Sequence, residues 1–425
     1  TYYFCIMLHQ DPIDKISVGI AIPLYKEKDY IHNLLRCLSE QTFLPTAVSF
    51  CINQPETNPS NSNFDLCQDS DYLNNSETEK IIQNTETPFL KLITDYYSPG
   101  KQQKKKNLGV GYARKAAANL LVLNHTPIDI LIFMDADTLY PKEYIKSVIQ
   151  NFHEKPTIDA ISIPYYHLLT SNDSINRAIL RYEIYLRWTA INSLKYKLPF
   201  SFTAFGSAIA CRTSSYIKFG EMSTKPAGED FYFLQKVVKQ GILATWNPIS
   251  VFPSSRISNR VIFGTGPTIA SGSESISEQY PLFYQSSFSE LKSIFQFLNQ
   301  IDQYASSIAN SNQWPDSIKL LMNIMSKGKI EEFLQLLIES KRPLKRLINE
   351  KLDALKIAQY LKARQIFHDN NSHITSFSKN LTPLPPSILN IKNYFNNTST
   401  EELNRVRNAL YHIELKLRMK EWQAL

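Results

Sequence analysis

The sequence predicts an α/β fold in which a mostly parallel sheet carries helices on both faces and is followed by a region made only of helices. Up to about Ser275, short apolar runs rich in β-branched residues alternate with segments whose apolar residues recur at helical spacing. This alternation is typical of parallel strands connected by helices. Beyond about Tyr280, the helical spacing continues and strand patterns almost disappear. We therefore expect a catalytic or binding domain at 1–275 and a helical C-terminal appendage at 276–425.

The strands of the first domain are expected where apolar runs are short and bounded by polar residues or proline. These runs lie at 18–22, 47–52, 89–93 and 128–134. Helices are expected at 29–41 and 111–123, because apolar residues recur there every three or four positions. Residues 56–84 are rich in Asn, Ser, Asp and Glu, which predicts a surface insertion with one short helix.

The C-terminal region is expected to contain amphipathic helices at 330–338, 344–367 and 401–422. Ser399 and Glu402 form a capping box in front of the last helix. Most of the net charge of +7 lies beyond Tyr280. That excess predicts either a solvated helical surface or a peripheral contact with an anionic membrane surface.

The composition predicts a soluble globular protein. The chain has 425 residues, of which 43% are hydrophobic and 20% are charged, so disorder is not expected. No apolar run approaches the ~18 residues needed to span a bilayer, and the N-terminal apolar run is too short for a signal peptide. The five cysteines show no CxxC spacing, which favours reduced thiols without a zinc site or disulfides. We expect a cytoplasmic protein that can contact the inner face of the membrane and does not bind nucleic acid.

Two carboxylates follow the most apolar of the expected strands. Asp135 and Asp137 come directly after the run that ends at Met134. The carboxyl ends of parallel strands form the ligand-binding edge of such a sheet. Carboxylates at that edge suit a hard divalent cation such as Mg²⁺ or Mn²⁺, and the cation in turn suits a phosphorylated substrate. Asp69 and Asp71 have the same spacing in a polar stretch and are expected to have no role, so the preceding strand is what makes the first pair informative.

Further candidate site residues follow the first two expected strands. Pro23, Tyr25 and Glu27 come after the first strand, and Asn53 follows the second. All four should therefore lie at the same sheet edge, where an amide such as that of Asn53 can pair with a nucleobase. Ordinary strand-to-helix turns would give the same pattern.

A basic, glycine-containing stretch precedes the helix at 111–123. Lys101, Gly109, Gly111 and Arg114 could bind phosphate, because glycines expose backbone N–H groups at a helix N-terminus and lysines add positive charge. A GxGxxG dinucleotide motif is excluded, because Arg114 replaces the third glycine. The alternative is a solvated basic loop.

Two further segments carry charges suited to a diphosphate substrate. Glu229 and Asp230 open a helix that runs to about Gly241, where acids also complement the helix dipole without any catalytic role. Arg256 and Arg260 follow, and their guanidinium groups could clamp a diphosphate.

The order of these segments resembles a family 2 glycosyltransferase of the GT-A fold over roughly Ile16 to Gly266. The matching motifs are Pro-x-Tyr-x-Glu, DxD after a hydrophobic strand, and Gly-Glu-Asp before a helix. The resemblance implies that the segment from Pro23 to Glu27 and Asn53 hold the nucleotide base. It also implies that Asp135 and Asp137 hold the ribose and the metal-bound diphosphate.

The same resemblance implies that Asp230 is the catalytic base and that Glu229 supports it. There are two departures from the family pattern, and one expected ligand is missing. Lys26 stands where Asn is usual, and Asn53 stands where Asp is usual. The third metal ligand, commonly a His, is not evident, and Phe252 lies near its expected position.

We therefore expect a metal-dependent, inverting glycosyltransferase. It would move a sugar from a nucleoside-diphosphate sugar to a hydroxyl of a glycan, lipid or small-molecule acceptor. One alternative is a nucleotidyltransferase, which would release pyrophosphate and would not need a base such as Asp230. Another is an inactive protein that binds sugar nucleotides and docks a partner through its basic helical tail.

Overall fold

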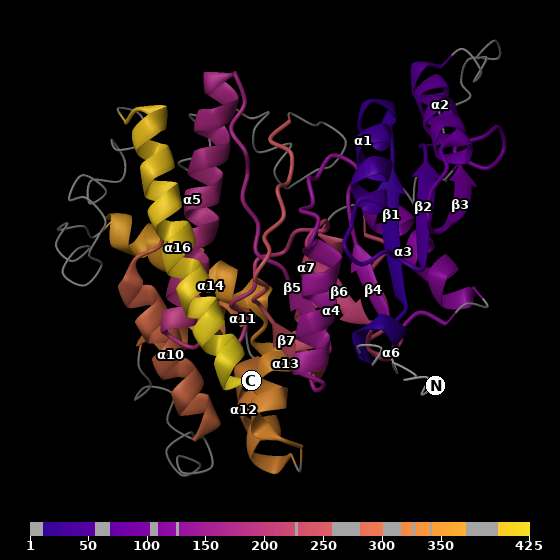
Figure 1. The fold of residues 1–425 in the computed structure, drawn as a ribbon. Helices are drawn as coiled ribbons and strands as arrows, with labels where there is room; N and C mark the ends of the chain where they lie inside the picture. Colours follow the sequence, from indigo (N-terminus) through magenta and orange to yellow (C-terminus); the bar gives the residue numbers. More distant parts are fainter. Residues whose placement is uncertain are drawn as a thin grey trace, which may run out of the picture.

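The structure is a computed structural model that describes residues 12–55, 69–102, 109–124, 127–225, 228–256, 281–300, 316–325, 329–340, 342–370 and 398–425. Within these residues, one sheet of seven strands forms the centre of the first domain (Figure 1). Along the sheet, the strands are β3 (Leu90–Tyr96), β2 (Ala47–Asn53), β1 (Val18–Leu24), β4 (Ile130–Phe133), β6 (Ile209–Arg212), β5 (Ala160–Ser162) and β7 (Leu243–Ala244).

Most neighbouring strands of this sheet run parallel, as expected. β1 pairs in parallel with both β2 and β4, and β2 pairs in parallel with β3. β6 is the exception, because it runs antiparallel to both β4 and β5. Sequence patterns do not reveal β5 and β7, because three- and two-residue strands are too short to show a period.

Helices cover both faces of the sheet, as predicted. The described helices of the first domain are α1 (Lys28–Ser39), α2 (Ser70–Asn84), α3 (Val110–Leu123), α4 (Tyr144–Glu154), α5 (Asp173–Lys195), α6 (Thr213–Lys218) and α7 (Glu229–Gln240). A short 3₁₀ turn, η1 (Pro12–Lys15), precedes β1. The alternation of side chains along β4 divides the core. Ile130 and Ile132 pack in the cluster that contains the apolar residues of α1 and α4, and Leu131 and Phe133 pack with α3 and α7.

The C-terminal part is helical, as predicted. Its helices are α10 (Gln285–Asn299), α11 (Asp316–Met325), α12 (Lys329–Glu339), α13 (Leu344–Lys351), α14 (Ala354–Asn370) and α16 (Thr400–Ala424). The single helix expected at 344–367 is in fact two, because Asp353 starts a new helix by accepting a hydrogen bond from the backbone N–H of Lys356 at 3.2 Å. Ser399 caps α16 as expected, since its Oγ accepts a hydrogen bond from the backbone N–H of Glu402 at 3.2 Å.

The last helix packs against the first domain. α16 lies alongside α5 (Figure 1), and their apolar residues, such as Ile184 and Leu410, form one buried cluster. Near the C-terminal end of α16, the Trp422 ring packs on Trp246 with the ring centroids 5.7 Å apart. The expected domain boundary at 275 lies outside the described residues.

A buried charge network also joins the two helices. Arg187 of α5 donates hydrogen bonds to Glu183 on its own helix and to Glu414 of α16, each at 2.6 Å. Arg407 of α16 donates to Glu183 at 3.1 Å, and Arg418 donates to Glu414 at 2.8 Å. Each of these five side chains is at most 3% exposed, so the network fixes α16 against α5 at a site where an unpaired charge would be costly.

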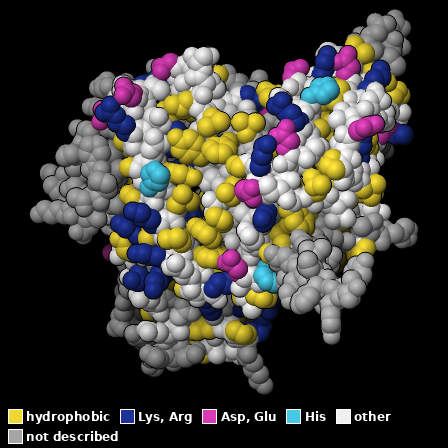
Figure 2. All heavy atoms as spheres, in the orientation of Figure 1, with side chains coloured by type: hydrophobic (Ala, Val, Ile, Leu, Met, Phe, Trp, Pro, Cys, Tyr) yellow, Lys and Arg dark blue, Asp and Glu magenta, His cyan; other side chains and the backbone are white. Residues whose placement is uncertain are grey.

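Other properties expected from the sequence concern thiols, membranes and surface charge. Cys37, Cys51 and Cys211 are free thiols, while Cys5 and Cys67 lie outside the described residues. No helix in the described ranges has the length and apolar character that crossing a membrane requires. Lys and Arg side chains gather over the C-terminal helices at the left of the face seen in Figure 2. Peripheral membrane contact through this basic region stays a prediction.

Candidate active site

A cavity of about 770 Å³ opens at the carboxyl ends of β1, β2 and β4. It brings together eleven of the residues singled out in the sequence, which come from segments far apart in the chain. They are Pro23, Tyr25, Glu27, Asn53, Gly109, Arg114, Asp135, Asp137, Glu229, Asp230 and Arg256. The shared edge of the parallel strands brings the first four close to the two Asp residues, as the strand pattern predicted.

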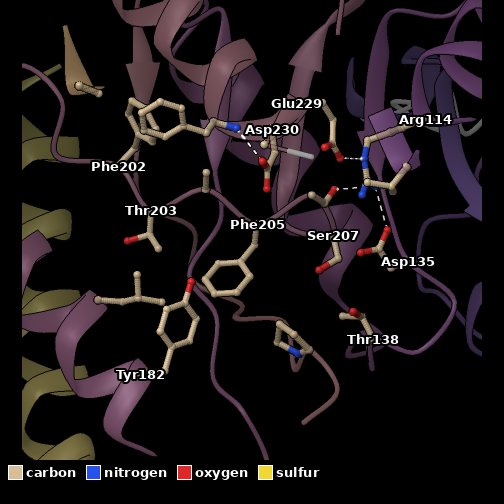
Figure 3. A pocket seen from close by; sticks show the side chains of 18 of the residues that line it. Arg114, Asp135, Thr138, Tyr182, Phe202, Thr203, Phe205, Ser207, Glu229 and Asp230 are labelled. Atoms are coloured by element: carbon tan, nitrogen blue, oxygen red, sulfur yellow. Dashed lines mark hydrogen bonds and ion pairs between the residues drawn. The ribbon is translucent and has the colours of Figure 1, made fainter. Parts of the chain in front are cut away.

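Arg114 organises the carboxylates on one side of this cavity (Figure 3). Its Nη1 donates a hydrogen bond to Asp135 Oδ1 at 2.8 Å, and its Nε donates to Glu229 Oε1 at 3.0 Å. Nη1 also donates to the backbone carbonyl of Gly206 at 3.2 Å. A Cβ at Gly206 would lie only 2.2 Å from the guanidinium, so a glycine is needed for this contact. The arginine therefore joins the end of β4 to the start of α7.

The two acids at the start of α7 lie in different surroundings. Glu229 is buried against Arg114, whereas Asp230 is half-buried and lines the cavity. Desolvation raises the pKa of both carboxyls above their ordinary values, and the attraction of Arg114 only partly offsets it. A carboxylate with a raised pKa is a better proton acceptor for a substrate hydroxyl than an ordinary Asp.

Glycines allow α3 and the segment before α7 to approach closely. A Cβ at Gly111 would lie 2.6 Å from the carbonyl oxygen of Lys225 and 2.7 Å from that of Ser223. These are backbone atoms, so they cannot rotate away. Gly228 has a φ of 74°, which favours glycine, and it allows the turn that aims Asp230 into the cavity.

A second guanidinium lies on the other side of the polar half of the cavity. Arg256 Nε forms an ion pair with Asp137 Oδ2 at 2.6 Å, and its Nη2 donates a hydrogen bond to Glu27 Oε1 at 2.7 Å. The same guanidinium lies over the Tyr30 ring, 4.4 Å from its centroid. These contacts place Asp137, Glu27 and Arg256 in one charged group at the ends of β1 and β4.

Two of the proposed site residues that the structure describes, Lys101 and Gly111, do not line this cavity. Lys101 is 62% exposed and forms an ion pair with Asp95 at 3.0 Å, so its charge is used at the surface. Gly111 does not line the cavity either, and its part is the close packing of α3 described above. Arg260 lies outside the described residues.

The second Asp-x-Asp pair needs a revised interpretation. Asp69 caps α2, where its side chain accepts hydrogen bonds from the backbone N–H groups of Asp71 and Tyr72. Asp71 accepts a hydrogen bond from the Tyr25 hydroxyl at 2.5 Å and pairs with Lys26 at 2.6 Å. Because Tyr25 lines the cavity, Asp71 supports the site from behind, contrary to the expectation that it has no role.

The acids of the cavity match a hard divalent cation only in part. Asp135 and Asp137 offer carboxylate oxygens, but no group of three or more His, Cys, Asp or Glu residues could hold a metal among the residues described. Phe252 forms a β-bridge with Leu139 and offers no ligand atom. Mg²⁺ is often held by only one or two carboxylates, with substrate phosphates and water completing its shell. The donor set therefore fits Mg²⁺ or Mn²⁺ if the substrate brings phosphate oxygens.

Sequence reasoning missed the other half of the cavity. It is lined by α5 and by the 200–207 segment, together with Phe283 and four residues of α14. Tyr182, Phe202 and Phe205 surround the open space next to Asp230 (Figure 3). The helical periodicity of α14 was visible in the sequence, but no sequence signal indicates which helix it faces.

The chain is similar in fold to several solved glycosyltransferase structures. One is Staphylococcus aureus TarS 1–349 in complex with UDP-GlcNAc, with a TM-score of 0.40 and 12% identity over 87% of this chain and 98% of that chain. Another is glucosyl-3-phosphoglycerate synthase from Mycobacterium tuberculosis in complex with Mn²⁺, UDP and glucosyl-3-phosphoglycerate. It has a TM-score of 0.34 and 10% identity over 55% of this chain and 70% of that chain. No protein-family model and no curated protein matches the sequence. Likenesses at this level do not establish an activity, so the assignment of a function depends on the site itself.

Proposed function

We propose that this protein is an inverting glycosyltransferase that moves a sugar from a nucleoside-diphosphate sugar to an acceptor hydroxyl. The observation that carries the proposal is the meeting of three groups in one cavity: the carboxylate Asp230, the acids Asp135 and Asp137 at the end of β4, and the guanidinium of Arg256. Each group suits one need of this reaction. The donor must be bound, the departing diphosphate must be stabilised, and the acceptor must lose a proton.

The nucleotide would bind at the sheet edge. Pro23 and Tyr25 at the end of β1 and Asn53 at the end of β2 offer an apolar wall and an amide for the base. Asp71 supports this wall by holding the Tyr25 hydroxyl. Asp135, which is one-third exposed while Arg114 holds one of its oxygens, is suited to accept a hydrogen bond from the ribose.

The diphosphate would lie beside the ion pair that Arg256 forms with Asp137 at the end of β4. Arg256 is about one-fifth exposed and offers N–H groups that can form charge-assisted hydrogen bonds with phosphate oxygens. Asp137, with Asp135, would hold Mg²⁺ or Mn²⁺ through carboxylate oxygens. When bound, that ion supplies Lewis-acid stabilisation of the negative charge on the leaving diphosphate.

Asp230 would act as the general base. Its raised pKa suits a group that takes a proton from a hydroxyl as the new bond forms, a contribution worth typically ~10²–10⁴-fold in rate. A single displacement with a base on the acceptor side inverts the anomeric carbon. Glu229 would support Asp230 indirectly, because it fixes Arg114 and the first turn of α7.

The test combines donor binding with product analysis. UDP-, GDP- and dTDP-sugars are screened by thermal shift, with Mn²⁺ present, because a bound ligand raises the stability of the folded state. Turnover of the donor that binds is then followed in the wild type, in Asp230→Asn and in Asp316→Asn, a control that is 97% exposed.

We expect release of the nucleoside diphosphate, intact donor binding in Asp230→Asn, and a ~10²–10⁴-fold loss of its turnover. The control should behave like the wild type. Release of pyrophosphate would instead identify a nucleotidyltransferase. Donor binding without any turnover in the wild type would favour an inactive binder, and a fully active Asp230→Asn would show that the base lies elsewhere.

A further inference from the structure

The cavity has two halves of opposite chemical character. The charged residues that line it are Glu27, Arg114, Asp135, Asp137, Glu229, Asp230 and Arg256, and all of them belong to the sheet edge, the first turn of α7 or the start of α3. The lining residues contributed by α5, α14 and the 200–205 segment include no Asp, Glu, Lys or Arg. A strongly polar or phosphorylated group would therefore find its charged partners only in the first half.

Aliphatic and aromatic side chains form most of the second half, alongside the hydroxyl groups of Thr189, Ser193, Ser201 and Thr203. α5 contributes Leu186 and Ala190, and α14 contributes Ile357, Ala358 and Leu361. Phe202 and Phe231 lie nearer to Asp230, with their ring centroids 6.0 Å apart.

Several of these apolar side chains keep part of their surface in the cavity. Leu186, Phe202, Phe231 and Ala358 line the cavity and are only half-buried. Apolar surface that faces water is unfavourable, and a ligand that covers it gains free energy in proportion to the area removed from water. This half of the cavity therefore favours a ligand group that is itself apolar.

We propose that the acceptor is an amphiphile whose hydrocarbon chain lies between α5 and α14 while its hydroxyl-bearing head reaches Asp230. This inference rests on the proposed function and adds the chemical class of the second substrate. The two halves meet at Asp230 (Figure 3). Phe231, which also lines the cavity, directly follows it on α7. A chain in the apolar half would hold the head group beside the base and opposite the site assigned to the diphosphate.

The α14 side of this half favours a hydrocarbon chain over a sugar chain, whereas the hydroxyl-bearing lining residues lie on α5 and the 200–205 segment. Sugars bind through hydrogen bonds to polar side chains as well as through stacking on aromatic rings. The α14 wall offers only Ala354, Ile357, Ala358 and Leu361, which present neither aromatic rings nor hydrogen-bonding side chains. The helical appendage therefore acts as the wall that recognises the acceptor chain.

Alkyl glucosides of increasing chain length are suitable probes. Binding of hexyl, heptyl and octyl glucoside below their micelle concentrations is measured by calorimetry with the full chain, and maltotriose serves as a purely polar probe. Burial of each added methylene should tighten binding about two- to fourfold. Affinity that does not change along the series, or maltotriose that binds more tightly than octyl glucoside, would overturn the proposal.

Variants of α14 locate the chain. Ala358→Phe fills the apolar half, whereas Ala363→Phe makes the same change on the same helix at a half-buried residue that does not line the cavity. Ala358→Phe should lose the dependence on chain length, and Ala363→Phe should keep it. Ala354→Phe provides a second blocking variant if the first unfolds. A folded blocking variant that still binds the alkyl series like the wild type would overturn the proposal.

Parallel measurements separate this inference from the proposed function. Binding of UDP, GDP and dTDP is measured in the same variants and should be unchanged in Ala358→Phe. Donor turnover together with a flat alkyl series would overturn only the amphiphilic acceptor. Chain-length-dependent alkyl binding without any nucleotide binding would support the apolar site and overturn the proposed glycosyl transfer.

Discussion

Replacing Arg114 by methionine should destabilise the folded state by about 3–5 kcal/mol, the range measured when one partner of a buried ion pair is removed. Both Arg114 and Glu229 have side chains only 3% exposed, and the Nε–Oε1 distance is 3.0 Å. Methionine fills much of the aliphatic space but supplies no donor. Glu229 would then lose the guanidinium that compensates its buried charge, and Asp135 would lose its 2.8 Å contact.

The destabilisation should depend on pH with a definite sign. Desolvation already raises the pKa of Glu229, and loss of the Arg114 charge raises it further. A carboxyl with a raised folded-state pKa contributes stability that is fully present below its unfolded-state pKa and is lost as pH rises through its folded-state pKa. The free-energy difference between wild type and variant should therefore be larger at pH 8 than at pH 5.

The assay is urea unfolding at both pH values, with the change in midpoint at constant slope taken as the change in stability. Lys115→Met is the matched control, because it removes a charge at the next residue of α3 from a pair with Glu221 that is about one-third exposed. Such pairs are worth ~0–1 kcal/mol. Adding Glu229→Gln to Arg114→Met should recover part of the loss by removing the buried charge. Equal effects of Arg114→Met and Lys115→Met at pH 8 would refute the reasoning.

Three further outcomes follow from the same contacts. Asp137→Ala should abolish the Mn²⁺ dependence of nucleoside-diphosphate binding in titration calorimetry, whereas Asp29→Ala, at an exposed residue, should leave it unchanged. Equal Mn²⁺ dependence in both variants would show that Asp137 is not a metal ligand. Glu414→Leu should lower the free energy of unfolding by ~3–5 kcal/mol in urea titrations, because it leaves Arg187 and Arg418 without that partner. The control Glu401→Gln, at an exposed residue, should change the free energy of unfolding by no more than ~0.5 kcal/mol. As the pH is lowered, donor turnover should begin to fall at a higher pH than it would with a base of ordinary Asp pKa. The pKa of Asp230 is raised, and a protonated base cannot accept a proton. A turnover rate that does not change down to pH 4 would contradict the assignment of Asp230 as the base.

The sequence was sufficient for features that depend on local pattern. β1, β2 and β4 could be predicted from short apolar runs, because a parallel strand that is buried on both faces needs apolar side chains at successive positions. Once those strands are parallel, the residues after them must share one edge. Asn53 and Asp135 therefore meet in the cavity, although they belong to different strands. The Ser399 cap could also be predicted from the local sequence, because its partner Glu402 lies only three residues away.

Only the tertiary structure decided which distant groups contact each other. Arg114 and Glu229 are 115 residues apart, and their ion pair requires that Gly111 let α3 approach the backbone before α7. In the sequence, Lys101 and Arg114 were equally good candidates for binding phosphate. In the structure, Lys101 pairs with Asp95 at the surface, whereas Arg114 is buried. The apolar half of the cavity exists because α14 and α5, which are remote in the chain, line the same cavity. Helical periodicity determines which face of a helix is apolar, but the choice of the opposing surface depends on packing between segments that are remote in the chain.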